Sequence, residues 1–438
     1  MMRMAPLRSL AVTLAALVPL GVLAPAVAAP PWSPIKTLSA QGANAQAATI
    51  KGSPDGGQVA AWTVGSPNRA VLQVARRPAG KGWSKPVTIS ARGAMTPRLA
   101  VGAKGRACLA WQLKRAGKLR PQGSCFVPKR GWSKPRFFTP AGSVSATVDV
   151  AMRGGAAVFV WDRFGNRDRV QTMRRSSSGS WSATTTLSSN GASGSAPAVA
   201  LDGNGLATVA WGESEPGGHR AIVVRRQKAG GGWTPGAILT PAGQDAVAPV
   251  IAEVQSGRAL VAWGTASEGV WSAHRPGATA LWDAAIQASP LGVTAGSPAV
   301  AANRTDDVFV LAWRAELGSG PVVQMTRRQF DGSWTLVHQV STTDSVAVFD
   351  PDVVLDAQQF ATVVWQEHDG AQYRIGFMRQ SNAGTWSPLS YLDVASSGGA
   401  YVPKATIVGN YTVSMIWRRY DGDDKLRVQT RSYDPAAA

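Results

Sequence analysis

The feature that most constrains the fold is a pair of evenly spaced tryptophan series, which together hold sixteen of the seventeen tryptophans. Neighbours within each series are 49 to 52 residues apart. The first series is Trp62, Trp111, Trp161, Trp211, Trp263, Trp313, Trp365 and Trp417, and the second is Trp32, Trp83, Trp132, Trp181, Trp233, Trp282, Trp334 and Trp386. A repeat of this length, present eight times, is typical of propellers and solenoids, in which one supersecondary unit recurs along the chain.

Each repeat predicts four short β-strands. A tryptophan of the first series ends a run that is almost wholly apolar, as in 207–211, and such a strand needs cover on both faces. A tryptophan of the second series is followed seven positions later by Ser, Thr or Asp, with an apolar residue just before it. In one repeat the expected strands are 196–201, 206–211, 219–226 and 233–239, with a hairpin turn at 202–205. Blades stacked around an axis would cover both faces of the second strand.

The two ends of the chain predict how the ring closes. Residues 32–39 have the pattern of a fourth strand without the three that should precede it, and residues 402–433 have the first three strands without a fourth. Together they make an eighth complete blade. We therefore expect an all-β, eight-bladed β-propeller of four-stranded antiparallel blades, closed by the N-terminal strand, as a single domain of residues 29–438.

Residues 1–28 predict a secretory signal peptide. Arg3 and Arg8 accompany an apolar stretch, 11–24, that is too short to span a bilayer, and small residues at 26–28 suit a cleavage site. No later apolar run in the sequence is long enough to cross a membrane. The expectation is a secreted, extracellular protein without a transmembrane segment, in an environment that permits disulfides.

Cys108 and Cys125 are the two cysteines of the chain, and the sequence predicts that they form a disulfide. A hairpin with its tip at 116–117 places them directly opposite each other on neighbouring strands. Counting outward from the tip assigns them to a non-hydrogen-bonded pair, whose closer side chains suit a cross-strand bridge. A reactive thiol pair is the alternative.

Residues 331–334, Asp-Gly-Ser-Trp, form the turn before a second-series tryptophan, and 80–83, 178–181 and 383–386 keep fragments of the same pattern. This turn resembles the Asp-box of sialidase-type propellers, Ser/Thr-x-Asp-x-Gly-x-Thr-Trp, in the degenerate form found in secreted bacterial propeller repeat proteins. The resemblance implies a fold and little chemistry, since no local motif places the arginine triad, the tyrosine–glutamate pair or the acid of a sialidase. The blades are also similar to those of quinoprotein alcohol dehydrogenases, but the vicinal cysteine pair of those enzymes is absent from the sequence.

Two neighbouring repeats differ from the others where the first strand begins. Most repeats have a small residue there, whereas Phe349 and Asp350 occupy this region in the seventh repeat, and Tyr401 and Lys404 in the eighth. Arg98 holds the matching place in the second repeat. All five are expected at the mouth of the central channel, where aromatic rings can stack on a sugar and charged groups can bond its hydroxyls. The alternative is that the aromatics plug a wide channel while nearby prolines shape the turn.

The formal net charge of +19 favours anionic partners, with solubility alone as the alternative. Arginines recur at the end of the third strand and supply much of this charge: Arg77, Arg175, Arg226, Arg275, Arg328, Arg379 and Arg431. We call them the arginine belt. The belt either attracts an anionic polymer or stacks on the following tryptophans and bonds turn carbonyls. Nucleic acid is not an expected partner, because most aromatics are expected to be buried rather than interleaved with the basic residues.

The leading hypothesis is a secreted, non-enzymatic, monomeric propeller that binds extracellular carbohydrate or an anionic envelope polymer, without cofactor or metal. A sialidase-like glycoside hydrolase is the runner-up, and a scaffold for another exported protein is the third possibility. The hydrolase would use paired carboxylates from the loops between second and third strands: Asp162, Glu213, Glu215, Glu367 and Asp369. Four scattered histidines predict no metal site, and the acidic run 421–424 lacks the rest of a calcium-loop signature.

Overall fold

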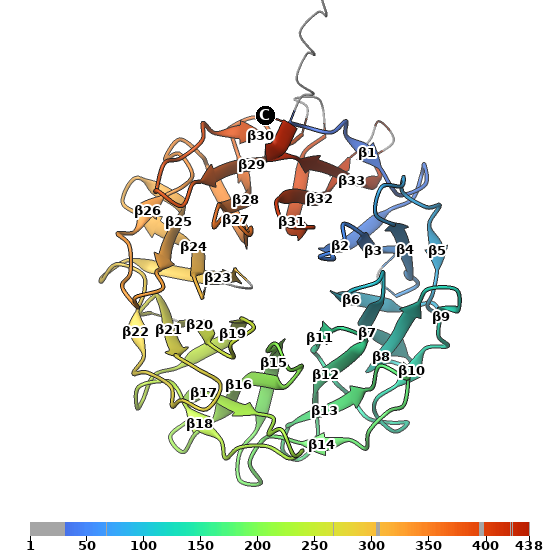
Figure 1. The fold of residues 1–438 in the computed structure, drawn as a ribbon, viewed down its shortest axis with the longest axis vertical. Coiled ribbons are helices and arrows are strands. Elements are labelled where there is room, and N and C mark those ends of the chain that lie inside the picture. The colour runs from blue at the N-terminus through green and yellow to red at the C-terminus, as the bar shows by residue number, and fades with distance from the viewer. Residues whose placement is uncertain are drawn as a thin grey trace, which may run out of the picture.

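Eight antiparallel sheets stand around a common axis, and each is one blade of a β-propeller (Figure 1). The computed structural model describes residues 31–437 apart from 67, 266, 304–306, 394–397, 421 and 423, so the predicted signal peptide lies outside the described residues. Within a blade the strands are lettered a to d, from the axis to the rim. The predicted all-β fold with eight four-stranded blades is confirmed.

Seven blades are continuous in sequence. Blade 1 contains β2 (Ala45–Gly52), β3 (Gln58–Val64), β4 (Val71–Arg77) and β5 (Val87–Thr88), and blade 2 contains β6 (Ala94–Val101), β7 (Ala107–Arg115), β8 (Lys118–Val127) and β10 (Arg136–Phe137), with β9 (Gly131–Trp132) beside β8. Blade 3 contains β11 (Val148–Arg153), β12 (Ala156–Arg163), β13 (Arg169–Arg175) and β14 (Thr185–Thr186), and blade 4 contains β15 (Gly194–Leu201), β16 (Ala207–Ser214), β17 (Arg220–Arg226) and β18 (Ala237–Ile238). Blade 5 contains β19 (Ala246–Glu253), β20 (Ala259–Thr265), β21 (Val270–Arg275) and β22 (Ile286–Gln287), blade 6 contains β23 (Thr294–Ala302), β24 (Phe309–Leu317), β25 (Gly320–Arg328) and β26 (His338–Gln339), and blade 7 contains β27 (Ala347–Leu355), β28 (Ala361–His368), β29 (Tyr373–Gln380) and β30 (Ser390–Tyr391).

Blade 8 joins the two ends of the chain. Its strands a to c are β31 (Ala400–Val408), β32 (Thr412–Tyr420) and β33 (Leu426–Tyr433), and its strand d is β1 (Lys36–Thr37). β1 pairs antiparallel with β33, as Figure 1 shows in blue beside red. The N–H of Leu38 donates to the carbonyl of Val428 (2.8 Å), which extends this pairing. The predicted closure of the ring by the N-terminal strand is therefore confirmed.

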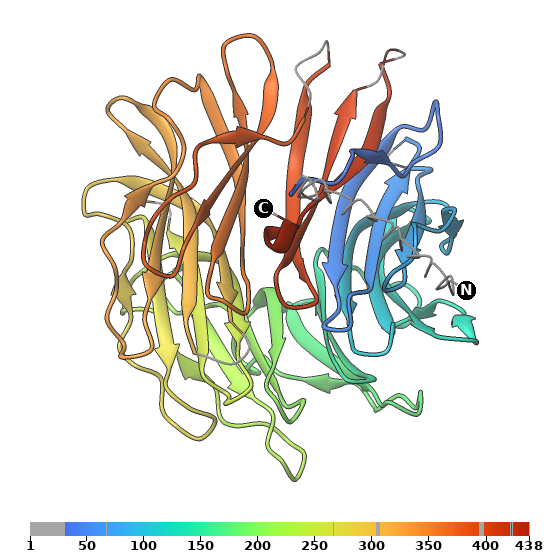
Figure 2. The ribbon, with the colours of Figure 1, turned by 45° about the horizontal axis from the view of Figure 1, so that its top comes forward.

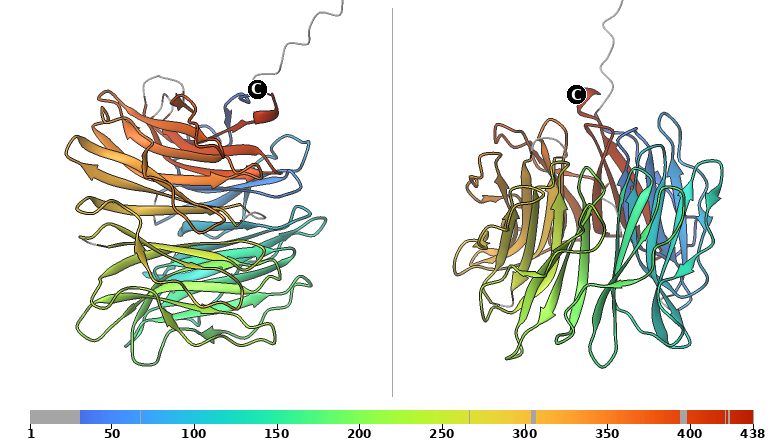
Figure 3. Two further views of the ribbon diagram at one scale, coloured as in Figure 1. Left: turned by 60° about the vertical axis from the view of Figure 1, so that its left-hand side comes forward. Right: turned by 60° about the horizontal axis from the view of Figure 1, so that its bottom comes forward.

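Loops gather on two opposite faces of the ring, because the strands run from one face to the other (Figure 2 and Figure 3). The b–c face carries the loops between strands b and c, together with the starts of strands a. The a–b face carries the loops between strands a and b. After β33 the chain forms the short 3-10 helix η1 (Pro435–Ala437). No helix among the described residues is long and apolar enough to cross a membrane.

The core lies between the blades. Every tryptophan of the first series lies in a strand b and has no exposed side-chain surface. Trp62 of blade 1, for example, packs in one cluster with Ile416 and Val428 of blade 8. Tryptophans of the second series are half-buried and lie ahead of strand d, where several form isolated bridges to the end of strand c. The expectation that strand b is covered on both faces is confirmed.

The polar residue seven positions after each second-series tryptophan has a structural role. In six blades its side chain accepts a hydrogen bond from an N–H of strand c, as Ser188 does from Val170 (3.1 Å) and Asp393 from Ile375 (3.0 Å). A buried backbone N–H needs an acceptor, and the short side chain provides it where strand d ends. The apolar residue just before, such as Leu187, is buried between blades.

The predicted disulfide between Cys108 and Cys125 is confirmed. The two cysteines lie opposite each other in β7 and β8, in the predicted register. At the hairpin tip Ala116 and Gly117 both have positive φ, of 49° and 76°, as a two-residue hairpin turn of this hand requires. Both half-cystines are buried in blade 2.

Removal of the disulfide is expected to lower the free energy of unfolding by about 3 kcal/mol, because the bridge closes a loop across a sequence separation of 17 residues. Urea unfolding of the wild type with and without reductant measures this loss. The pair of changes Cys108→Ala and Cys125→Ala should reproduce the reduced midpoint and make it insensitive to reductant. An unchanged midpoint on reduction would contradict the prediction.

Candidate functional site

A β-bulge interrupts strand a in seven blades, close to the b–c face. In blade 7 it lies between Phe349 and Asp352, and in blade 8 between Tyr401 and Lys404. Within the bulge of blade 8, Val402 has φ of 48°, a strained conformation for a β-branched residue. A bulge bends its strand and changes the direction of the side chains beside it. The predicted mouth residues of blades 7 and 8 therefore flank two adjacent bulges.

Charged side chains follow the regular bulge position in four blades. Arg98, Asp149, Asp352 and Lys404 each lie opposite the residue that precedes the buried tryptophan of strand b, so they occupy one level around the axis. Each aspartate accepts a hydrogen bond from an N–H of strand a in the next blade, at 3.1 and 2.8 Å. Burial raises the pKa of Asp149, and the charge of Arg98 opposes this rise. The charge of Arg98, in blade 2, therefore acts on Asp149 in blade 3. Lys404 lies in blade 8, next to blade 7.

Four aromatic rings form a continuous row across the b–c face of blades 7 and 8. We call Phe349, Tyr373, Tyr401 and Tyr420 the aromatic row. Successive ring centroids are 6.1, 5.2 and 5.6 Å apart, and His368 packs edge-on against Tyr373 at 4.7 Å. The two end members, Phe349 and Tyr420, are each 37% exposed, and the two central tyrosines are half-buried. The row is therefore a partly exposed aromatic surface with firmly packed rings.

The hydroxyl of Tyr401 can act as a hydrogen-bond donor in this row. Burial raises the pKa of Tyr401, and the neighbouring Tyr420 and Tyr373 raise it further. The phenol therefore stays protonated around neutral pH. Asp350, the remaining predicted mouth residue, lies in β27, but its side chain is outside the described part of the structure.

Sequence reasoning found two members of the row and missed the rest. Tyr373, Tyr420 and His368 lie at the ends of strands b and c, next to the b–c loops of blades 7 and 8. One signal in the sequence could have found them. The seventh and eighth repeats both carry aromatic residues at the start of strand a and beside the b–c loop. His368 is one of four histidines that lie in four different repeats, so the sequence does not single it out.

Three of the carboxylates proposed for a hydrolase serve structural hydrogen bonds. Glu367 is buried and accepts from the indole of Trp365 (2.6 Å) and the hydroxyl of Tyr391 (2.6 Å), so burial and this carboxylate raise the pKa of Tyr391. Glu213 accepts from the indole of Trp211 (2.8 Å). Asp162 is buried and accepts four hydrogen bonds from residues 145–147, in the one blade that lacks the bulge.

Asp369 and the acidic run 421–424 do not form a catalytic or metal site among the described residues. Asp369 is exposed and accepts hydrogen bonds from two N–H groups of its own loop, which lower its pKa. Of the acidic run 421–424, Asp421 and Asp423 lie outside the described residues. Within the described part of the chain, no three His, Cys, Asp or Glu side chains gather so as to hold a metal ion.

The arginine belt lies within and between the blades. Arg175, Arg275 and Arg379 are buried, while Arg77, Arg226, Arg328 and Arg431 are half-buried. Arg275 donates to the turn carbonyl of Gly257 (3.1 Å), and Arg431 donates to the carbonyl of Ser33 (2.9 Å). Their guanidinium groups lie over the rings of Trp282 and Trp32, at 5.2 and 4.7 Å. Arg77 donates to a turn carbonyl, and Arg226, Arg328 and Arg379 contact carboxylates. These contacts match the structural alternative for the belt, and its contact with an anionic polymer stays a prediction.

Comparison with known proteins shows the fold. No protein-family profile matches the chain, and no curated protein sequence matches it. It is similar to the BP39L lectin from Burkholderia pseudomallei, with a TM-score of 0.57, 15% identity and coverage of 82% of this chain and 100% of the lectin. The chain shares its propeller fold. The NanB sialidase from Streptococcus pneumoniae gives a TM-score of 0.43 and 11% identity over 87% of this chain and 84% of that one, and a leech intramolecular trans-sialidase gives 0.39 and 10% over 92% and 71%.

Proposed function

We propose that the chain is a secreted, non-enzymatic propeller that binds carbohydrate on the aromatic row. The observation that carries this proposal is the row itself, with neighbouring ring centroids no more than 6.1 Å apart and its end rings exposed. Sugar rings have apolar C–H faces that stack on aromatic side chains, while a few polar groups fix their orientation. The Tyr401 hydroxyl is such a polar group, and Lys404 and Asp352 lie just after the two bulges.

Two further observations support binding without catalysis. Asp162, Glu213 and Glu367 are occupied by hydrogen bonds that hold the blades, so they are poorly placed to shuttle protons to a glycoside. A protein of similar fold is named a lectin, which supports a carbohydrate-binding role for this architecture. Secretion is proposed on residues 1–28. The net charge of +19 favours glycans that carry carboxylate or sulfate groups within this class.

Tyr401→Ala is expected to weaken glycan binding by about tenfold or more, because it removes a central stacking ring. Isothermal titration of the mature protein against neutral and anionic polysaccharides, at low and high salt, measures the effect. Tyr411→Ala is the matched control, because Tyr411 is 39% exposed on the a–b face of the same blade. Weak salt dependence is expected if stacking dominates, and a steep one if charge does.

The proposal fails if Tyr401→Ala binds as well as the wild type, or if no polysaccharide binds at all. Absence of binding would favour the protein-scaffold hypothesis. Release of reducing sugar from any member of the panel would show that the protein is an enzyme, and the same assay with Glu213→Gln and Glu367→Gln would then test the carboxylates.

A further inference from the structure

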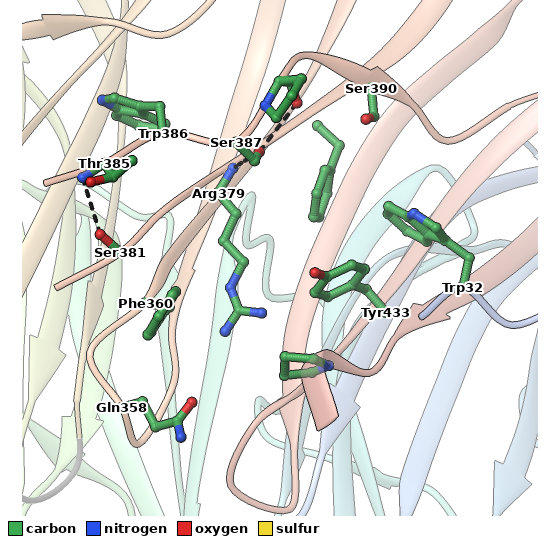
Figure 4. A pocket seen from close by; sticks show the side chains of 13 residues that line it. Trp32, Gln358, Phe360, Arg379, Ser381, Thr385, Trp386, Ser387, Ser390 and Tyr433 are labelled. Atoms are coloured by element: carbon green, nitrogen blue, oxygen red, sulfur yellow. Dashed lines mark hydrogen bonds between the residues drawn. The ribbon is translucent and has the colours of Figure 1, made fainter. Parts of the chain in front are cut away.

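A cavity of about 580 Å³ lies between blades 7 and 8 and contains no member of the aromatic row (Figure 4). Its walls come from β29, β30 and β33, from the β27–β28 and β29–β30 loops, and from the residues before β1 and after β33. The volume is in the range of sites that hold small ligands. It therefore differs from the candidate site in both position and lining.

One wall of this cavity is a packed aromatic cluster. The ring centroids of Trp32 and Phe377 are 4.8 Å apart, and those of Trp32 and Tyr433 are 5.0 Å apart. Phe360 stands across from this cluster, and the guanidinium of Arg379 lies between them (Figure 4). These rings provide the flat apolar surfaces on which a sugar ring can stack.

Among the described residues, the side chain of Arg379 donates no hydrogen bond to blade 8, although its guanidinium lies 5.4 Å from the ring centroid of Tyr433 in that blade. At the matching place in blade 3, Arg174 donates to Gly205 and Gln227 of blade 4, and in blade 6 Arg327 likewise bonds residues of blade 7. Arg379 instead pairs with Asp356 of its own blade. The junction between blades 7 and 8 therefore lacks the hydrogen-bonded arginine bridge of those two junctions.

The polar groups of the cavity suit an uncharged ligand. Asp356 neutralises Arg379, so the buried charge is balanced within the protein. The Nε–H of Arg379 is buried and has no hydrogen-bond acceptor among the described residues, which leaves one donor to satisfy. Five hydroxyl-bearing side chains also line the cavity: Ser381, Thr385, Ser387, Ser390 and Tyr433. An anion would find no uncompensated positive charge, and a purely apolar ligand would bury these hydroxyls.

We propose that the cavity between blades 7 and 8 is a second binding site, for an uncharged pyranose unit of a glycan. The ring of the sugar would stack on the Trp32–Tyr433 wall, and its hydroxyls would bond the serine and threonine side chains. This site does not depend on the aromatic row. A ligand on both sites would be held by two contacts on one chain, which raises its overall affinity.

Tryptophan signals can report on ligand binding in the cavity separately from binding on the aromatic row. Trp32 and Trp386 line the cavity, whereas the aromatic row contains no tryptophan. We would label the mature protein with fluorotryptophan and assign these two fluorine NMR signals with Trp32→Phe and Trp386→Phe. The probes are the methyl glycosides of glucose, galactose, mannose, fucose and N-acetylglucosamine at millimolar concentration, with methyl sialoside as the charged comparison.

We expect at least one uncharged glycoside to shift the Trp32 and Trp386 signals, and methyl sialoside to leave them in place. Ser390→Phe, which places a ring in the cavity, should weaken this response by about tenfold or more. Thr185→Phe, at the matching position of strand d in blade 3, is the control and should leave it unchanged. Tyr433→Phe keeps the wall and removes one hydroxyl, so it should weaken binding less than Ser390→Phe and stay folded.

Absence of any shift at Trp32 and Trp386 with all uncharged probes would overturn the proposal, as would an undiminished shift in both Ser390→Phe and Tyr433→Phe. Tyr401→Ala should not alter the response of the cavity. Loss of polysaccharide binding in Tyr401→Ala with retained fluorine shifts would support both sites. Retained polysaccharide binding together with retained fluorine shifts would support the cavity alone.

Discussion

A chain that lacks residues 31–40 is expected to lose the closed ring. This segment supplies β1 to blade 8, together with the half-buried Trp32 and the buried Leu38. Loss of two large apolar side chains from a packed core lowers the free energy of unfolding by about 5 kcal/mol or more. β33 would also become an unpaired edge strand, which invites association with other chains. Urea unfolding and size-exclusion chromatography should therefore show a lower midpoint and self-association.

Point changes in the same segment show whether stability depends on the contacts that close the ring or on the length of the chain. Leu38→Asp should lower the free energy of unfolding by about 3 kcal/mol or more, because it buries a charge where Leu38 packs on blades 1 and 8. Lys36→Ala, at an exposed position of β1, should change it by less than about 0.5 kcal/mol. A synthetic peptide of the segment should restore the truncated chain. Unfolding of the truncated chain at the wild-type midpoint would show that the ring does not need this strand.

The features that sequence predicted are those set by period and pairing. Trp365 and its counterparts recur at one place in the repeat because strand b is covered on both faces in every blade. Cys108 and Cys125 could be paired because strand register follows from the hairpin tip. The closure of blade 8 followed from an incomplete repeat at each end.

The features that sequence missed depend on contacts with another strand of the same blade or with the next blade. Arg379 and Arg174 occupy the same place in their blades, yet one pairs with its own blade and the other bridges to the next. Nothing in the local sequence of either arginine distinguishes these contacts. Tyr373 likewise connects the two blades in the aromatic row because Tyr401 of the next blade lies 5.2 Å away. The sequence period predicts the strands of each blade. The contacts that a side chain makes depend on the junction between its blade and the next.

The clearest test of such a junction is Arg275→Met, which is expected to lower the free energy of unfolding by about 3–5 kcal/mol at neutral pH. Arg275, in blade 5, is 2% exposed and donates to the fully buried carboxylate of Glu253 at 2.5 Å. The hydroxyl of Thr208, in blade 4, donates to the same carboxylate at 3.1 Å. Without its arginine, the carboxylate would be buried without its nearest counter-charge.

The pH dependence of that loss distinguishes an unpaired charge from a packing defect. Burial raises the pKa of Glu253 to about 7, and Arg275 opposes this rise, so removal of Arg275 should raise the pKa further. A carboxyl with a higher pKa in the folded state binds its proton more tightly there than in the unfolded chain. The deficit of Arg275→Met should therefore shrink as the pH falls from about 8 to about 5. Adding Glu253→Leu should restore most of the stability and remove this pH dependence, because neither charge then remains buried. A deficit that is equal at every pH, or a double variant no more stable than the single one, would show that packing rather than charge pairing holds this junction.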